Sequence, residues 1–133
     1  MIPAVLREQT LALLGALGAY TAYAALAKAP RVPRGSAALT FRVLNDGRIV
    51  RVRDEATIGR AGGHAIVLED LRVSRSHARV VRRGARAWVE DVGSRNGTYV
   101  NGGQIEQPTA LRPGDRIEVG ASAVEFVGME PWK

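Results

Sequence analysis

From residue 37 onward the sequence is a succession of short apolar or alternating runs, each ended by turn residues, and this pattern most constrains the fold. Residues 39–43 alternate apolar and polar side chains, and Asn45-Asp46-Gly47 then predicts a hairpin turn into residues 48–52. Further short runs follow at residues 57–59, 66–68, 78–82, 87–91, 98–100, 116–119 and 124–127. No window of useful length after residue 36 shows helical periodicity. About ten short strands with such regular turns predict an all-β fold, an antiparallel β-sandwich.

The N-terminal part of the chain has a different character. Residues 10–27 are 18 consecutive positions without a charged side chain. As a helix they would span about 27 Å, close to the roughly 30 Å hydrocarbon core of a bilayer. Lys28, Arg31 and Arg34 follow the run, and this positive charge favours a cytoplasmic location for everything after it. We therefore expect one N-terminal hydrophobic helix that anchors the chain in the cell inner membrane as a single-pass protein.

Two alternatives to the anchor remain open. The run could be a soluble helix that packs on the following domain, although it shows no polar stripe at helical spacing. It could also be a cleaved signal peptide, because Ala25-Leu26-Ala27 resembles a small-residue cleavage site. Arg7 and Glu8, the only charged side chains before the run, cancel, which disfavours a signal peptide.

The expected organisation is an N-terminal segment (1–9), the anchor helix (10–27), a basic proline-containing linker (28–36) and a β-domain (37–130). The chain has a formal net charge of +6, and residues 1–36, with four basic and one acidic side chain, account for half of it. The folded part is therefore only mildly basic. Because the chain has no cysteine, disulfide scaffolds, thiolate zinc sites and cysteine nucleophiles are excluded.

Three predicted loops carry unusual chemistry. Arg60 follows a strand that ends in glycine, residues 72–77 read R-V-S-R-S-H, and residues 93–98 read G-S-R-N-G-T. Together they offer guanidinium groups, hydroxyls, an amide and backbone N–H groups, which suit a tetrahedral oxyanion. Taken one at a time, such residues are ordinary: an arginine after a strand is usually solvated, and Asn-Gly is usually a turn.

The order and spacing of these motifs resemble a known family. Residues 58–60 (I-G-R), 73–78 (V-S-R-S-H-A) and 91–98 (D-V-G-S-R-N-G-T) are similar to the signature of forkhead-associated (FHA) domains, and residues 111–115 (L-R-P-G-D) fit the family's turn before its last strands. The resemblance covers about residues 37–128. It implies a β-sandwich whose apical loops bind phosphothreonine in an extended segment of a partner protein.

The resemblance also implies roles for individual residues. Arg60 would bond the phosphate, Ser74 would donate its hydroxyl to the same group, and Arg75 would add a donor or a favourable charge. Asn96 would hold the ligand's main chain beside the phosphothreonine. Arg95 stands where several family members have threonine or serine, and a cation there could reach the phosphate or an acidic ligand residue.

Other residues of these loops are expected to support the binding site. Gly59 would let two loops approach closely, and Gly97 would permit a positive φ in its turn. His77 is expected to bond backbone and to fix the loop of Ser74. His64 lies in a glycine-rich loop and is expected to be solvated.

The predicted function is a phosphothreonine-dependent adapter at the cytoplasmic face of the membrane, with no catalytic residues, no metal and no cofactor. A membrane anchor followed by an FHA domain resembles bacterial proteins that work with Ser/Thr kinases near cell-wall synthesis and division. This resemblance implies that its partners are threonine-phosphorylated proteins, a Ser/Thr kinase or its substrate, in cell-wall or division regulation. An enzyme is disfavoured because Ser74 and His77 have no evident orienting acid. Nucleic acid is disfavoured because the folded part has few aromatics and a small excess charge. A membrane scaffold with an FHA fold that needs no phosphate remains the alternative.

Overall fold

The structure is a computed structural model that describes residues 35–132. These residues form eleven strands and no helix. The strands are β1 (Ala37–Val43), β2 (Ile49–Arg53), β3 (Glu55–Gly59), β4 (Ile66–Val67), β5 (Ala78–Arg83), β6 (Arg86–Asp91), β7 (Thr98–Val100), β8 (Gly103–Gln104), β9 (Thr109–Leu111), β10 (Arg116–Val119) and β11 (Ser122–Pro131). The predicted all-β class is confirmed for this part of the chain.

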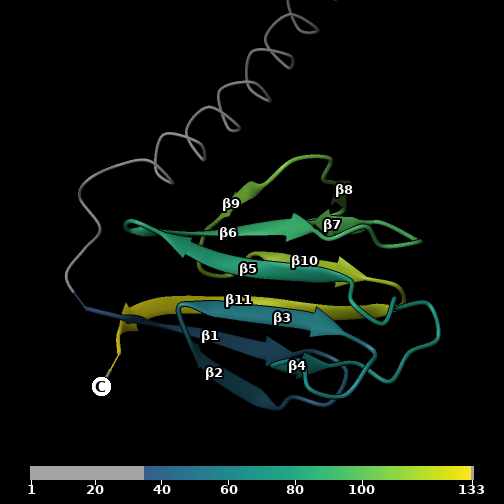
Figure 1. Cartoon of the computed structure of the whole chain (residues 1–133), viewed down its shortest axis with the longest axis horizontal. Coiled ribbons are helices and arrows are strands. Elements are labelled where there is room, and N and C mark those ends of the chain that lie inside the picture. Colours follow the sequence, from purple (N-terminus) through teal and green to yellow (C-terminus); the bar gives the residue numbers. More distant parts are fainter. Residues whose placement is uncertain (1–34, 133) are drawn as a thin grey trace, which may run out of the picture.

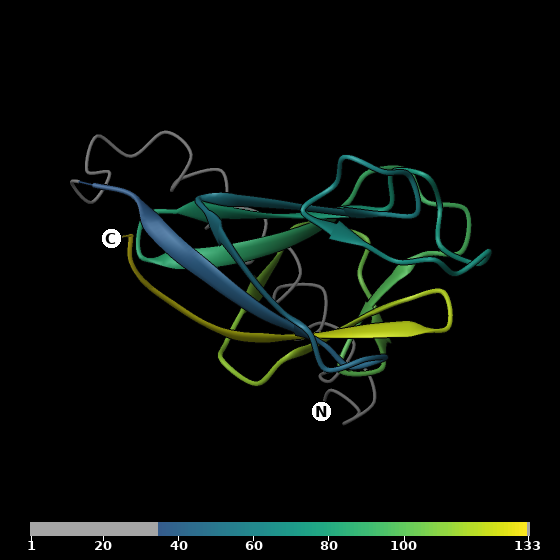
Figure 2. The ribbon, with the colours of Figure 1, turned by 90° about the horizontal axis from the view of Figure 1, so that it is seen from below.

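The strands form two sheets that stack face to face (Figures 1 and 2). One sheet has six strands in the order β2-β1-β11-β10-β7-β8, and the other has five in the order β4-β3-β5-β6-β9. The prediction of a purely antiparallel sandwich needs one correction, because β3 and β4 pair in parallel, with Ile58 opposite Ile66. A parallel pair needs a crossover instead of a tight turn. The loop from Arg60 to Ala65 provides it and thereby folds back beside the end of β3.

The alternating pattern of the first hairpin explains its position in the sandwich. In β1, Leu39, Phe41 and Val43 are fully buried, and Arg42 between the last two is exposed. Phe41 lies 5.6 Å from Phe126 of β11, ring centroid to ring centroid, in the interior between the sheets. The turn predicted at residues 45–47 joins β1 to β2, and Gly47 has the positive φ of 78° that such a turn demands.

Two strands were absent from the sequence prediction, and both are short and poorly apolar. β8 contains only Gly103 and Gln104, and it pairs with β7 through the turn at Asn101-Gly102, where both residues have positive φ. β9 pairs with β6, with Leu111 opposite Ala87. Strands of two or three residues carry too few positions to show a period, so tertiary pairing alone defines them.

The expected hydrophobic helix at residues 10–27 lies outside the described residues, as do the N-terminal segment and most of the linker. Between residues 35 and 132 there is no helix of the length and apolarity needed to cross a membrane.

Candidate functional site

Three loops that are far apart in the sequence meet at one end of the sandwich, which lies at the right of Figure 1. They are the β3–β4 loop (60–65), the β4–β5 loop (68–77) and the β6–β7 loop (92–97). Backbone hydrogen bonds hold them together: Arg60 N donates to Ser74 O (3.0 Å), Ala61 N to Arg75 O (3.2 Å) and Val92 N to His77 O (3.1 Å). The meeting of the loops is therefore fixed by the main chain and does not depend on a ligand.

Gly59 sits where the first two loops approach most closely. A Cβ atom at this position would lie 2.2 Å from the carbonyl oxygen of Arg75 and 2.7 Å from the ring of His64. Real Cβ atoms do not come closer than about 3.0 Å to such atoms. The absence of a side chain at residue 59 is thus a steric condition for this arrangement of the loops.

His77 joins the β4–β5 loop to the β6–β7 loop. Its ring is fully buried; its Nδ1 accepts a hydrogen bond from Ser74 N (3.0 Å), and its Nε2 lies 2.8 Å from Gly97 O. Because Nδ1 accepts and a carbonyl can only accept, the ring hydrogen belongs on Nε2. With both nitrogens bonded to backbone, the ring is not placed to remove a proton from the Ser74 hydroxyl.

Asp91 organises the turn that carries Arg95 and Asn96, and the sequence analysis did not single it out. Its carboxylate accepts hydrogen bonds from Gly93 N (2.8 Å), Ser94 N (2.7 Å), the Ser94 hydroxyl and Thr98 Oγ1 (2.7 Å). Burial raises the pKa of Asp91, but the bonds from Ser94, Thr98 and Gly93 outweigh it and hold the pKa below its ordinary value. A signal was present, because an aspartate two residues before Gly-Ser is typical of an Asx turn.

Arg60 and Ser74 lie on adjacent loops, joined by a backbone hydrogen bond, and keep unused hydrogen-bonding capacity. Arg60 is half-buried, and its Nε donates to Val73 O (3.0 Å). Within residues 35–132 its two terminal nitrogens have no hydrogen-bond or ion-pair partner. Ser74 Oγ accepts from Arg95 N (3.0 Å), which leaves its hydroxyl hydrogen available as a donor.

Asn96, Arg75 and Arg95 complete the group of predicted ligand residues, and the structure places all five around the same end of the sandwich. Asn96 Nδ2 donates to Arg72 O (2.7 Å), so its amide oxygen and second hydrogen remain available. The side chains of Arg75 and Arg95 are exposed, and neither forms an ion pair with any residue that the structure describes. We call this group of Arg60, Ser74, Arg75, Arg95 and Asn96 the cationic cup.

His64 differs from its expected position. The prediction of a solvated side chain is wrong, because the ring is half-buried and its Nε2 lies 2.7 Å from the carbonyl oxygen of Arg75 and 3.4 Å from Ser76 Oγ. The parallel pairing of β4 with β3 folds the intervening loop back over the end of β3, which carries His64 onto the β4–β5 loop. His64 therefore helps to hold the backbone of Arg75.

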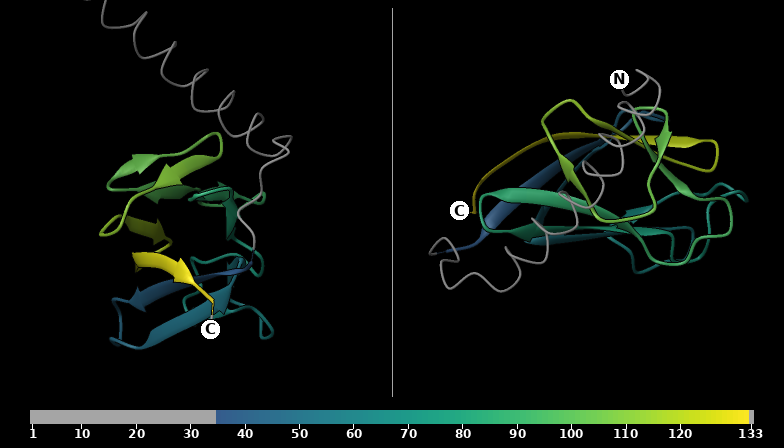
Figure 3. Two further views of the ribbon diagram at one scale, coloured as in Figure 1. Left: turned by 90° about the vertical axis from the view of Figure 1, so that its left-hand side faces the viewer. Right: turned by 90° about the horizontal axis from the view of Figure 1, so that it is seen from above.

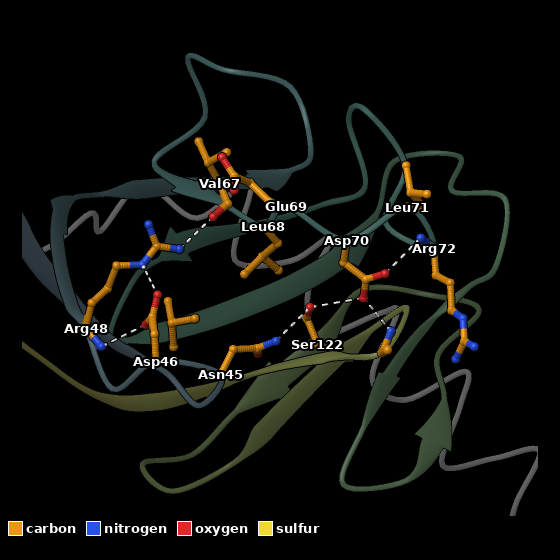
Figure 4. A pocket seen from close by; sticks show the side chains of 12 residues that line it. Asn45, Asp46, Arg48, Val67, Leu68, Glu69, Asp70, Leu71, Arg72 and Ser122 are labelled. Atoms are coloured by element: carbon orange, nitrogen blue, oxygen red, sulfur yellow. Dashed lines mark hydrogen bonds and ion pairs between the residues drawn. The ribbon is translucent and has the colours of Figure 1, made fainter.

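The cup is flanked by two hollows. A groove of about 810 Å³ begins at Arg72 and runs between the β4–β5 loop, the β1–β2 turn and the β10–β11 turn (Figure 4). A smaller hollow of about 330 Å³ lies on the other side, beside Asn96, Gly97 and Gln104. A ligand chain that crosses the cup at Asn96 would thus have room on both sides.

Asp70 holds the floor of the groove in place. Its carboxylate accepts from Arg72 N (2.9 Å), Ala121 N (2.8 Å) and Ser122 Oγ (3.1 Å), as Figure 4 shows. The backbone bond from Arg72, helped by those from Ala121 and Ser122, keeps the pKa of Asp70 below its ordinary value against the opposing effect of burial. The neighbouring Leu71 is 90% exposed at the rim. The sequence analysis missed these residues, because the pairing of Asp70 with Ser122 joins positions 52 residues apart.

Comparison with known proteins gives a consistent result. The family model described as "FHA domain" matches residues 56–120. The FHA domain-containing protein FhaB of Mycobacterium tuberculosis is 34% identical over 88 residues, which are 66% of this chain and 57% of that protein. The match thus spans little more than half the length of this curated relative.

Solved structures share the fold. One, described as a structural and functional analysis of phosphothreonine-dependent FHA domain interactions, is 30% identical with a TM-score of 0.62, and the match covers 72% of this chain and 98% of that one. Another is EmbR of Mycobacterium tuberculosis in complex with a low-affinity phosphopeptide, at 30% identity and a TM-score of 0.61, covering 69% of this chain and 24% of that one. The described domain is therefore similar over nearly all of its length to an FHA domain studied for phosphothreonine-dependent interactions and to part of a protein solved with a phosphopeptide.

Proposed function

The chain belongs to the forkhead-associated (FHA) domain family, and from this premise we propose that it is an adapter that binds threonine-phosphorylated proteins through its cationic cup. The observation that carries the proposal is that Arg60 and Ser74, joined by a backbone hydrogen bond, both keep side-chain donors unused among the described residues. A phosphate on threonine brings about −1.5 to −2 charges and three strong acceptor oxygens to that space.

Different residues of the cup would bind the phosphate and the main chain of the ligand. The Arg60 guanidinium and the Ser74 hydroxyl would bond the phosphate oxygens, and Arg75 would add positive charge beside them. Asn96 would bond the main chain of the ligand, because its amide oxygen and one hydrogen are free while Nδ2 is held by Arg72 O. Main-chain bonding fixes the register of an extended peptide, which phosphate bonding alone does not. Residues on either side of the phosphothreonine would enter the groove and the smaller hollow.

The cup supports a binding role instead of hydrolysis. A nucleophilic serine requires a base within hydrogen-bond reach of its oxygen. The His77 ring nitrogens are both engaged with backbone atoms, and Ser74 Oγ is bonded to Arg95 N. The bound phosphate would therefore be held and not removed.

We further propose that residues 10–27 anchor the domain at the cytoplasmic face of the membrane, where it recruits a Ser/Thr kinase or a kinase substrate active in cell-wall synthesis or division. The 18-residue uncharged run and the basic residues after it support the anchor. Tethering to one membrane raises the effective concentration of partners on that membrane, so a modest intrinsic affinity suffices for recruitment.

The test measures binding of the full chain to phosphothreonine peptides selected from a degenerate library. Arg60→Ala removes charge-assisted hydrogen bonds worth roughly 1.5–3 kcal/mol each, so affinity should fall about tenfold to a thousandfold in calorimetry. Arg112→Ala, in the β9–β10 turn, removes the same kind of side chain away from the cup and should leave affinity unchanged. Circular dichroism confirms that both variants are folded. Equal affinities for wild type and Arg60→Ala, or for phosphorylated and unphosphorylated peptide, would contradict the proposal.

A scaffold that binds without phosphate is the second candidate. It makes the opposite prediction in a pull-down from lysate treated with phosphatase. A phosphothreonine adapter loses its partners after treatment, whereas a scaffold keeps them.

A further inference from the structure

The end of the sandwich opposite the cup has its own chemical character. Here the first described residues lead into β1, β2 ends, β5 turns into β6, and β11 ends, as the left side of Figure 1 and the left panel of Figure 3 show. We call this end the base. Its residues are Gly35, Ser36, Arg51, Arg53, Asp54, Arg82, Arg83, Gly84, Ala85, Arg86, Glu130, Pro131 and Trp132.

An ion pair between the buried Arg82 side chain and the partly exposed Asp54 ties the segments of the base together. Arg82, whose side chain is 8% exposed, donates from Nε to Asp54 Oδ1 (2.9 Å), and its terminal nitrogens donate to the carbonyl oxygens of Gly84 (3.1 Å) and Gly35 (3.0 Å). Asp54 also accepts from Ala37 N (2.8 Å). The bond from Ala37, together with Arg82, holds the pKa of Asp54 below its ordinary value despite the opposing effect of burial. The point where the chain enters the domain is thereby tied to the β5–β6 turn.

Arg51 pairs with Glu130 (3.6 Å), whereas three other arginines of the base have no acidic partner among the described residues. Arg53 and Arg86 are exposed and Arg83 is half-buried, and within residues 35–132 none of the three forms an ion pair. Arg83 and Arg86 are opposite each other at the end of the β5–β6 ladder. Like charges in directly opposed positions destabilise a sheet. An external anion would relieve this local repulsion.

Trp132 lies among these arginines. Its side chain is 36% exposed, and the Cζ atoms of Arg51 and Arg53 lie 4.7 Å and 5.9 Å from its ring centroid. Its backbone N donates to Ser36 O (2.8 Å), which fixes it beside the point where the chain enters the domain. Tryptophan together with arginine is the composition favoured at the boundary between lipid headgroups and water.

The sequence places the base close to the proposed anchor. Seven residues lie between Ala27 and Gly35, and the eight steps from one Cα to the next along a fully extended chain reach at most about 29 Å. If residues 10–27 form the anchor, the base is the end of the domain that lies nearest the membrane. Lys28, Arg31 and Arg34, which lie in this connection, add positive charge of the same sign.

We propose that the base of the domain, through Arg53, Arg83, Arg86 and Trp132, rests on the anionic lipid surface of the membrane. This inference rests on the proposed anchor at residues 10–27. Because the cup lies at the opposite end of the sandwich, contact at the base directs the cup away from the membrane and towards phosphorylated partners. The arginines set the orientation of the domain, and the anchor sets its location.

The test uses the full chain reconstituted into vesicles that carry a quencher of tryptophan fluorescence at headgroup depth. One set of vesicles is phosphatidylcholine alone, and the other also contains phosphatidylglycerol. The chain has two tryptophans, and Trp88 is 2% exposed, so the difference between wild type and Trp132→Phe reports Trp132. We expect quenching of Trp132 in the anionic vesicles only, with loss at raised salt.

The double variant Arg83→Gln/Arg86→Gln should lower the ratio of docked to undocked domain by about fivefold for each arginine removed. The control variant Arg116→Gln, which changes an exposed arginine in β10, should match the wild type. Flotation of the vesicles separates the two proposals. A chain that floats with both kinds of vesicle but shows no charge-dependent quenching has an anchor and no docked base, and this overturns the inference alone. A chain that floats with neither overturns the anchor, and the inference with it.

Discussion

The steric role of Gly59 gives a prediction that can be worked out atom by atom. In Gly59→Ala the new Cβ would lie 2.2 Å from Arg75 O, whereas 3.0–3.4 Å is already tighter than nine in ten real contacts of this kind. Either β3 or the β4–β5 loop must therefore move by roughly 1 Å. The ring of His64, at 2.7 Å, can rotate away, but the carbonyl oxygen of Arg75 belongs to the backbone and cannot.

The expected loss of stability has two parts. Overpacking of this kind costs about 1–3 kcal/mol. The carbonyl that must move also accepts bonds from Ala61 N and His64 Nε2, and weakening of these adds about 0.5–1.5 kcal/mol each. A total of about 2–6 kcal/mol would lower the melting temperature of a domain of this size by at least about 8 °C.

Binding should fall with stability, because Ser74 precedes Arg75 on the displaced loop and a site loosened by about 1 Å loses its preorganised geometry. The assay is thermal unfolding together with phosphopeptide affinity at a temperature where the variant is folded. Gly62→Ala is the matched control: it lies in the same β3–β4 loop, has no positive φ, and its added Cβ would meet nothing within 4 Å. The steric argument fails if Gly59→Ala and Gly62→Ala show the same melting temperature and affinity.

Two further predictions concern the supports of the cup. His77→Phe puts a somewhat larger apolar ring in the same place and leaves Ser74 N–H and Gly97 C=O without their partner. Chemical denaturation should therefore show a loss of stability of about 2–5 kcal/mol. No loss would mean that these two bonds do not stabilise the domain. Acid should destabilise the domain through Asp91, because the pKa of this carboxyl in the folded state lies below its ordinary value of 3.8. The contribution of Asp91 to stability is therefore complete above pH 3.8. It is lost as the pH falls through the lowered pKa. Asp91→Asn should therefore be less stable at neutral pH and show a smaller further loss in acid; an unchanged acid profile would contradict this.

The sequence was sufficient to predict the fold class because short apolar or alternating runs follow one another and are separated by turn residues. β1, with its buried Leu39, Phe41 and Val43, is formed by such a run. The parallel pairing of β3 with β4 could not be predicted in the same way. β4 has two residues, and its direction depends on the path of a six-residue loop whose own hydrogen bonds are made to a different segment. The wrong placement of His64 follows from this one unpredicted pairing.

The candidate site was predicted more completely than its supports were. Arg60, Ser74 and Asn96 stand in short motifs whose spacing resembles the family signature, and the structure gathers them at one end of the sandwich. Asp70 shows what such motifs omit. Its role is to bridge Arg72 with Ala121 and Ser122, and a contact across 52 residues leaves no local pattern. Motif spacing thus finds the groups that face a ligand, whereas long-range packing determines what holds them.

Arg95 illustrates how the structure separates two functions that the sequence assigns to one residue. Its backbone N–H donates to Ser74 Oγ and so orients the hydroxyl of the cup. Any residue other than proline supplies this donor, which explains why the position can hold an arginine where several family members have threonine or serine. The Arg95 side chain is therefore not needed to orient the Ser74 hydroxyl. It is exposed beside the hollow next to Asn96 and Gly97. Under the proposed function, its charge would be available to acidic ligand residues that flank the phosphothreonine, while the backbone of the same residue holds the cup together.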